Sequence, residues 1–197
     1  IQSKDLLEKE KKRIINFSKT FDEKKKLVYF STCSIDDPLR NKSLYRRNKI
    51  DIEHIIKKEF KKFLIIRLPE VVGKSDNNFT LTNFLYNKIK KKEKFEVWSK
   101  AKRNLIDIDD AVTLTINYLK NEKMKNIINV ANPISFSILE IVKEFEILSK
   151  VKANYSLVDK DDISWSIDVS PIAQEIKYCK IVFNKNYLSA LLKKYYF

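Results

Sequence analysis

Tyr45 and Lys49 stand four residues apart in the segment SLYRRNKIDIE, a spacing that places two side chains on one face of a helix. A phenol ordinarily ionises near pH 10, and a neighbouring ammonium favours its ionised form. Such a pair could exchange a proton with a substrate oxygen in an alcohol–ketone interconversion. A hydroxyl from Thr32 or Ser34, which stand at the end of a short apolar segment, could orient that oxygen.

The spacing alone is a weak signal for this chemistry. Nine tyrosines and 34 lysines in 197 residues predict about 1.6 such pairs by chance, and the chain has a second one, Tyr86 with Lys90. The second pair lies in the middle of a predicted helix with no hydroxyl-bearing strand end before it, so we interpret it as surface. The elements around Tyr45 must decide whether the first pair is different.

Apolar segments alternate with amphipathic ones along the chain. Uninterrupted apolar segments of strand length lie at 26–32, 63–73 (interrupted by Pro69) and 126–133, with a shorter strand near 95–98. Helical spacing predicts helices over about 3–20, 44–60, 80–91, 109–119, 137–150 and 187–197. Ser43 is a candidate N-cap, and Ser137 with Glu140 has the spacing of a capping box. This alternation predicts an α/β fold whose parallel sheet is covered on both faces.

Ligands of open parallel sheets bind at the carboxyl ends of the strands. The segments STCS and RLPEVVG lie there, next to the start of the helix that carries Tyr45. We interpret Gly73 as a turn residue that needs a positive φ, and Asp109 with Asp110 as the cap of the following helix. His54 is interpreted as structural, and Trp98 as a core residue or a stacking surface for a base.

Composition limits the classes of partner. The net charge of +14 comes from 34 lysines and six arginines, spread along the chain in runs that also contain acids, as on solvated helix faces. We therefore expect attraction to anionic ligands. Because nucleic-acid sites tend to rely on arginine and the chain has few arginines, we expect no dedicated nucleic-acid site. Two cysteines are too few for a metal site, and no apolar run could span a membrane. With a charged N-terminus in place of a secretion signal, a cytoplasmic protein is expected.

The segments VYFSTCS, YRRNK, IIRLPEVVG and RNLIDIDDAV, in that order, resemble the NAD(P)-dependent epimerase/dehydratase family, the sugar-nucleotide group of extended short-chain dehydrogenase/reductases. The resemblance implies the C-terminal part of a doubly wound, Rossmann-like parallel sheet in residues 1–73. Residues 74–197 would form a smaller, mixed substrate-binding lobe with returning Rossmann elements. It further implies that the chain begins before the family's fifth strand, so that the Gly-rich cofactor loop is absent. The single glycine, Gly73, agrees with that expectation.

The resemblance also implies roles for individual residues. Thr32 would lie beside the reacting oxygen, Tyr45 would exchange the proton, and Lys49 would hold the cofactor ribose and lower the pKa of Tyr45. The residues implied to contact the cofactor, NAD or NADP, are Ser31, Tyr45, Lys49, Leu68 and Pro69. Those implied to contact a nucleotide-sugar substrate are Ser34, Glu70 and Arg103, the last at the diphosphate.

The function implied is an NAD(P)-dependent sugar-nucleotide reductase or epimerase that serves surface polysaccharide synthesis. Cys33 and Ser34 stand where sugar 4,6-dehydratases of the family carry Asp-Glu, which speaks against dehydration. A non-catalytic protein that keeps the fold for assembly is an alternative, because these residues cannot hold a dinucleotide. A basic nucleic-acid-binding module is a second alternative. The family also suggests a homodimer through the Tyr45 helix, although lysines on the outer face of that helix weigh against it.

Overall fold

A three-stranded parallel sheet forms the centre of the first part of the protein. The computed structural model describes residues 4–37, 43–120, 126–159 and 166–197. The strands of this sheet, in spatial order, are β1 (Leu27–Thr32), β2 (Phe63–Leu68) and β7 (Ile127–Asn129). All three run parallel, and the register sets Thr32 opposite Leu68, so β1 and β2 end at the same edge of the sheet.

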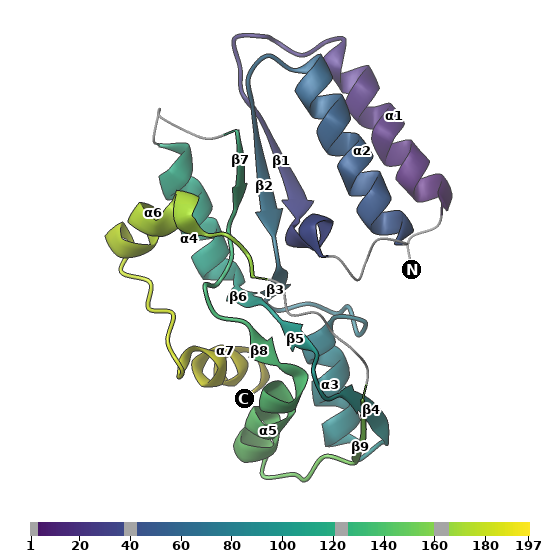
Figure 1. The fold of residues 1–197 in the computed structure, drawn as a ribbon, viewed down its shortest axis with the longest axis vertical. Helices are drawn as coiled ribbons and strands as arrows, with labels where there is room; N and C mark the ends of the chain where they lie inside the picture. The colour runs from purple at the N-terminus through teal and green to yellow at the C-terminus, as the bar shows by residue number, and fades with distance from the viewer. Residues whose placement is uncertain (1–3, 38–42, 121–125, 160–165) are drawn as a thin grey trace.

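Helices cover both faces of this sheet, as Figure 1 shows. One face carries α1 (Lys4–Ser18) and α2 (Leu44–Glu59), and the other carries α4 (Ile108–Leu119) and α6 (Ala173–Tyr178). The central strand explains the arrangement, because its side chains alternate between the faces. Ile65 packs with Ile52 and Ile56 of α2, whereas Leu64 and Ile66 belong to the core on the α4 side. The prediction of a parallel sheet covered on both faces is confirmed.

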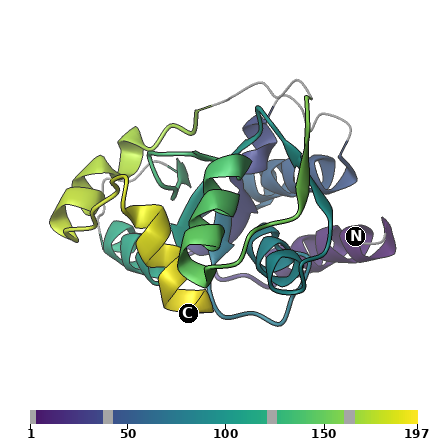
Figure 2. The same ribbon diagram turned by 90° about the horizontal axis from the view of Figure 1, so that it is seen from below.

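Three two-stranded pairs and three helices make up the second part. The strand pairs are parallel β3 (Glu70–Val72) with β6 (Leu105–Asp107), parallel β4 (Phe95–Trp98) with β9 (Tyr155–Val158), and antiparallel β5 (Lys102–Arg103) with β8 (Phe136–Ser137). The helices are α3 (Leu81–Lys90), α5 (Ile138–Ser149) and α7 (Tyr187–Tyr196). Figure 2 shows α5 between α3 and α7, where Leu85, Phe145 and Leu192 are completely or almost completely buried in a common core.

Two of the predicted N-caps, Ser43 and Ser137, are confirmed. The Ser43 side chain accepts from the Arg46 N–H at the start of α2, and Ser137 with Glu140 forms a capping box on α5. The cap predicted for α4 was wrong. Asp107, rather than Asp109 or Asp110, is the N-cap, because its carboxylate accepts from the Asp109 N–H at 2.9 Å. Asp109 and Asp110 lie in the first turn, where acids suit the helix dipole.

The role predicted for Gly73 was also wrong. The backbone of Gly73 does not have a positive φ. A Cβ added there would lie 2.9 Å from Cγ2 of Ile108, so the residue is small because the start of α4 packs directly against it. Trp98 is 40% exposed, which corrects its interpretation as a core residue.

We predict that Gly73→Ala lowers the free energy of unfolding by about 1–3 kcal/mol, because the new methyl group overpacks a tight contact. Combining it with Ile108→Ala, which removes the atoms that the new methyl group would meet, should cost less than the sum of the two single losses. Urea denaturation of the four proteins measures this coupling. Strictly additive losses would show that the two side chains do not meet.

Candidate functional site

The carboxyl edge of the sheet brings together several residues predicted to form a site. Thr32 ends β1 opposite Leu68 of β2, and Pro69 follows directly. The Thr32 hydroxyl lies 2.9 Å from the Ser34 hydroxyl and accepts from the Ser34 N–H, so Thr32 caps the short helix η1 (Cys33–Asp36). Thr32 and Ser34 therefore form one hydroxyl pair at this edge.

Tyr45 and Lys49 share one face of α2, as their spacing predicts. Tyr45 lies in the first turn and is 37% exposed, and the Lys49 ammonium lies 5.8 Å from the centre of its ring. Lys49 itself is buried, and its ammonium has two partners that the sequence did not reveal. Its ammonium donates to the Glu10 carboxylate at 2.9 Å and to the Tyr29 hydroxyl at 2.7 Å.

Tyr29 completes a closed triangle with Glu10 and Lys49. Its hydroxyl donates to Glu10 at 3.0 Å while it accepts from Lys49. Burial, followed by the negative charge of Glu10, raises the pKa of Tyr29 well above its usual range, so this phenol stays protonated. An ammonium has three N–H donors. Two of those of Lys49 are directed at Glu10 and Tyr29.

A buried ion pair lies under the same edge. The guanidinium of Arg67 on β2 meets Glu53 of α2 through two bonds of 2.9 and 2.7 Å, and its remaining nitrogen donates to Asp36 at 2.9 Å. Ser31, which was predicted to contact the cofactor, donates its hydroxyl to Glu53 at 2.7 Å. This network joins β1, β2, η1 and α2. It also engages the Ser31 hydroxyl.

Cys33 reinforces the same junction as a thiol. Its sulfur donates to the carbonyl oxygen of Arg67 at 3.3 Å, and burial raises the pKa of the thiol to about 12. The thiol is therefore protonated, and Cys33 is buried. Across the residues that the structure describes, no group of three His, Cys, Asp or Glu side chains could hold a metal ion.

The other two residues predicted to contact substrate meet each other on the second part of the protein. Arg103 of β5 lies 3.7 Å from the Glu70 carboxylate of β3. Two buried asparagines hold the neighbouring loop: the Asn104 amide donates to the Asn132 carbonyl at 2.6 Å, and the Asn132 N–H donates back to Asn104 at 3.2 Å. The backbone that follows Arg103 is thus held by hydrogen bonds between these two asparagines.

The helix α7 closes onto the N-terminus of α4. Lys194 donates to Asp107 at 2.7 Å, and the Tyr195 hydroxyl donates to the same carboxylate at 2.7 Å. Tyr187 accepts from the Asp107 N–H and donates to Asp110 at 2.7 Å. Burial opposes ionisation of Asp107, but the bonds from Lys194 and Tyr195 outweigh it and lower the pKa of this carboxyl. The two parts of the protein are tied at this junction.

The second Tyr–Lys pair has a structural place. The Lys90 ammonium lies 5.6 Å from the centre of the Tyr86 ring, so the helical spacing recurs there. Tyr86 is half-buried, however, with its ring centre 5.0 Å from that of Tyr196 and 6.0 Å from that of Phe145. Its interpretation as a surface residue was wrong, because α5 and α7 cover that side of α3. His54 is exposed on α2.

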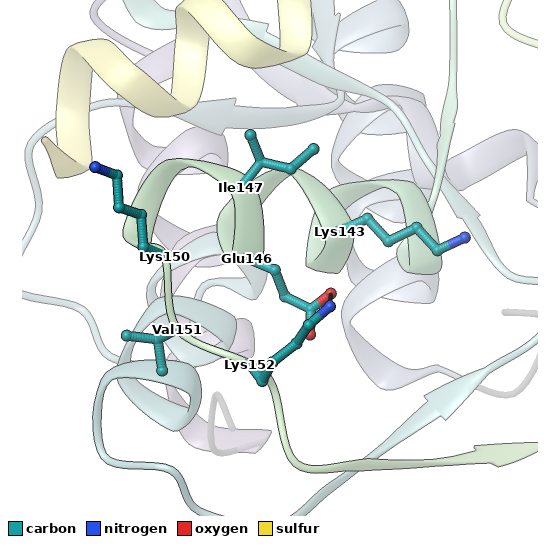
Figure 3. Close-up of a pocket in the computed structure, with 6 residues that line it drawn as sticks. All are labelled: Lys143, Glu146, Ile147, Lys150, Val151 and Lys152. Carbon is teal, nitrogen blue, oxygen red and sulfur yellow. Dashed lines mark ion pairs between the residues drawn. The ribbon is translucent and has the colours of Figure 1, made fainter.

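A hollow at the end of α5 gathers lysines without forming a site. Figure 3 shows Lys143 and Lys150 pointing to opposite sides of the helix, so their charges do not converge on a common ligand. Lys152 lies beside Glu146, 3.6 Å between charged atoms. In the described ranges, none of the helices has the length and apolar character needed to cross a membrane.

The partners Glu10 and Glu53 were missed by sequence reasoning. Glu10 sits in the run EKEKK, where nothing distinguishes it from solvated charges. Glu53 did carry a signal, because it follows Ile52 and precedes Ile56 by three residues, which places an acid on the apolar face of its helix. Arg67 is the matching signal, as a charge inside the apolar segment FLIIRL.

Comparison with known proteins identifies the relatives of this architecture. A model of the NAD dependent epimerase/dehydratase family matches residues 11–131, more than half of the chain. No curated protein matches the sequence.

Solved structures with the same fold cover most of the chain. The dTDP-glucose 4,6-dehydratase of Bacillus anthracis strain Ames, in complex with NAD, matches with a TM-score of 0.73 and 14% identity, over 92% of this chain and 64% of that one. The UDP-glucuronic acid 4-epimerase of Bacillus cereus, in complex with UDP-glucuronic acid and NAD, gives 0.64 and 20%, over 85% and 59%. WbmG of Bordetella bronchiseptica, with NAD and UDP, gives 0.68 and 17%, over 91% and 63%.

The chain therefore spans less than two thirds of the length of these three structures. At such low identities the match establishes the fold, and the expected Rossmann-like α/β class is confirmed.

We predict that Glu53→Gln destabilises the protein by about 1.5–3 kcal/mol, because it removes the buried carboxylate that bonds the half-buried Arg67 guanidinium and leaves Asp36 as its acidic partner. The control is Glu23→Gln, which removes the same charge from an exposed pair with Lys61. That change should cost less than about 1 kcal/mol. Chemical denaturation compares the two variants, and equal losses would contradict the structural weight given to the buried pair.

Proposed function

Because this chain belongs to the NAD dependent epimerase/dehydratase family, we propose that it carries the proton-transfer residues of an enzyme that interconverts alcohol and ketone on a nucleotide-linked sugar. Two observations support the proposal: Tyr45 and Lys49 share one face of α2, and the Thr32 hydroxyl ends β1 at the carboxyl edge of the parallel sheet. A ligand of such a sheet would lie at that edge.

Each of the three side chains suits one task. Tyr45 would give or take the proton of the reacting oxygen, since its phenol is exposed at the start of α2. The positive charge of Lys49 would favour the phenolate during that transfer. Thr32 would donate to the substrate oxygen and receive support from Ser34, 2.9 Å away.

The residues present suit the nicotinamide end of NAD. The third N–H of Lys49 is suited to a ribose hydroxyl, and Leu68 with Pro69 offers an apolar edge to a flat ring. Ser31 would contribute through its backbone, because its hydroxyl is bonded to Glu53. When bound, NAD supplies a hydride acceptor and donor for the sugar carbon. A single glycine cannot form a Gly-rich phosphate loop, so the pyrophosphate would be held by residues outside this sequence.

The second part of the protein carries the residues that we propose for substrate binding. We propose that Arg103 binds the diphosphate of a nucleotide sugar, with Glu70 as its partner until the phosphates arrive. Trp98, which is 40% exposed, would stack on the base. The Cys33-Ser34 pair in place of Asp-Glu favours a reductase or epimerase over a dehydratase. A cytoplasmic role in surface polysaccharide synthesis and a homodimer through α2 stay predictions.

We predict that Tyr45→Phe lowers turnover of the full-length enzyme by about 10²–10⁴-fold, the usual contribution of a positioned acid–base group, without unfolding the protein. Lys49→Met should lower turnover and also weaken NAD binding, since one ammonium serves both. Steady-state kinetics and NAD titration measure the two effects.

The matched control is Tyr86→Phe, which removes a phenol at the same Tyr–Lys spacing while its ring stays packed against Tyr196. We expect wild-type turnover and NAD affinity from it. Wild-type turnover in Tyr45→Phe would instead sink the catalytic role of the SLYRRNK segment.

A further inference from the structure

We infer that Glu10 of α1 is a positioning residue for Lys49 and that its charge sets the pH range in which Tyr45 works. The inference rests on the proposed function and extends it to an element that carries none of the residues predicted from the sequence. Glu10 lies 39 residues before Lys49 in the chain, and α1 packs against α2.

The contacts of Glu10 define a closed cluster. One carboxylate oxygen accepts from Lys49 at 2.9 Å and from Tyr29 at 3.0 Å, and the other accepts from the Asn48 amide at 3.1 Å. Asn48 is 2% exposed, and its side-chain oxygen, Oδ1, has no hydrogen-bond partner among the described residues. Both oxygens of Glu10 are therefore directed at α2 and β1, which no solvated surface acid would need.

Glu10 is the acid that offsets the charge of Lys49. The charged and titratable groups around the ammonium are Glu10 from α1, Tyr29 from β1 and Tyr45 from α2. The other acid of α2 near this cluster, Glu53, is held by Arg67, and the neighbouring Lys11 is paired with Asp51 at 2.6 Å.

The charges around Lys49 determine the direction in which loss of Glu10 would move the pH–rate profile. As a base, Tyr45 is active when ionised, so the rate rises with pH on the acid side. A negative charge beside Lys49 weakens the stabilisation that the ammonium gives to the phenolate. Removing that charge therefore moves the acid limb to lower pH, whereas a merely structural Glu10 would change the rate or stability and leave the limb in place.

The test is Glu10→Gln in the full-length enzyme, which keeps the shape and removes the charge. The half-maximal rate on the acid side should move to lower pH by about one unit, a tenfold change in proton concentration. The control is Glu8→Gln on the same helix, whose exposed carboxylate lies 3.3 Å from the Lys11 ammonium. It should leave the profile unmoved, and Glu10→Asp, which keeps the charge, should return it close to that of the wild type.

The rate of lysine acetylation, measured by mass spectrometry, tests the contact between Glu10 and Lys49 without an activity assay. In the wild type, Lys49 should react about tenfold more slowly than Lys58, which is 83% exposed, because its pairing with Glu10 and its burial cover the amine. Equal rates would overturn the inference even if Glu10→Gln did not fold. In a folded Glu10→Gln protein the rate at Lys49 should rise, and in Glu8→Gln it should not.

The outcomes separate the two proposals. A pH profile that Glu10→Gln leaves unmoved, in an enzyme that Tyr45→Phe inactivates, overturns the role of Glu10 and leaves the proposed function standing. Full activity of Tyr45→Phe removes the proposed function and with it the pH role of Glu10, while the acetylation rates still decide whether Glu10 holds Lys49.

Discussion

The ion pair between Glu53 and Arg67 is the interaction on which the carboxyl edge of the sheet depends. A buried charge is tolerated only when its partner and its remaining bonds are all supplied, and here Ser31 and Asp36 supply them. Because Glu53 points inward against β2, α2 cannot rotate about its axis. Tyr45 lies about two turns earlier on that helix, so its direction is set by a contact that it does not make.

A second constraint acts on the same face of α2, one turn before Glu53. Glu10 bonds to Lys49 and so links α2 to α1. The helix α2 is therefore held at Glu53 by Arg67 and at Lys49 by Glu10. Both acids are anchored through charged bonds with fixed geometry rather than through apolar contact, which fixes direction as well as distance. The site face of α2 is thus preorganised before any ligand arrives, an arrangement that favours precise proton transfer.

Most of the fold could be predicted because its signals are local. The apolar composition of segments 26–32 and 63–73 predicts buried strands. Ser43 and Ser137 indicate helix starts, because their side chains accept hydrogen bonds from backbone N–H groups three residues later. What failed depended on distant atoms. Gly73 is small because Ile108 approaches it, and Asp107, the cap of α4, also bonds to Lys194 and Tyr195 of α7.

The candidate site divides along the same line. Tyr45, Lys49 and Thr32 could be selected because spacing within a helix and the end of a strand are readable in sequence. Glu10 could not, since its role exists only after α1 has packed beside α2, and in the sequence it is one acid among lysines. Ser31 shows the converse, because its place at the strand end was predicted correctly while its hydroxyl is directed toward Glu53.

The junction between α7 and α4 has a consequence for how the protein is made. Its bonds join residues 77 to 88 positions apart, from Asp107 and Asp110 to Tyr187, Lys194 and Tyr195. A ribosome releases the chain from its N-terminus, so α1, β1, α2 and β2 can assemble while α7 is still unmade. Until α7 emerges, Phe145 and its neighbours lack the cover of Leu191 and Leu192. A nascent chain that stalls before α7 therefore presents an open apolar core, the kind of surface that chaperones and proteases recognise.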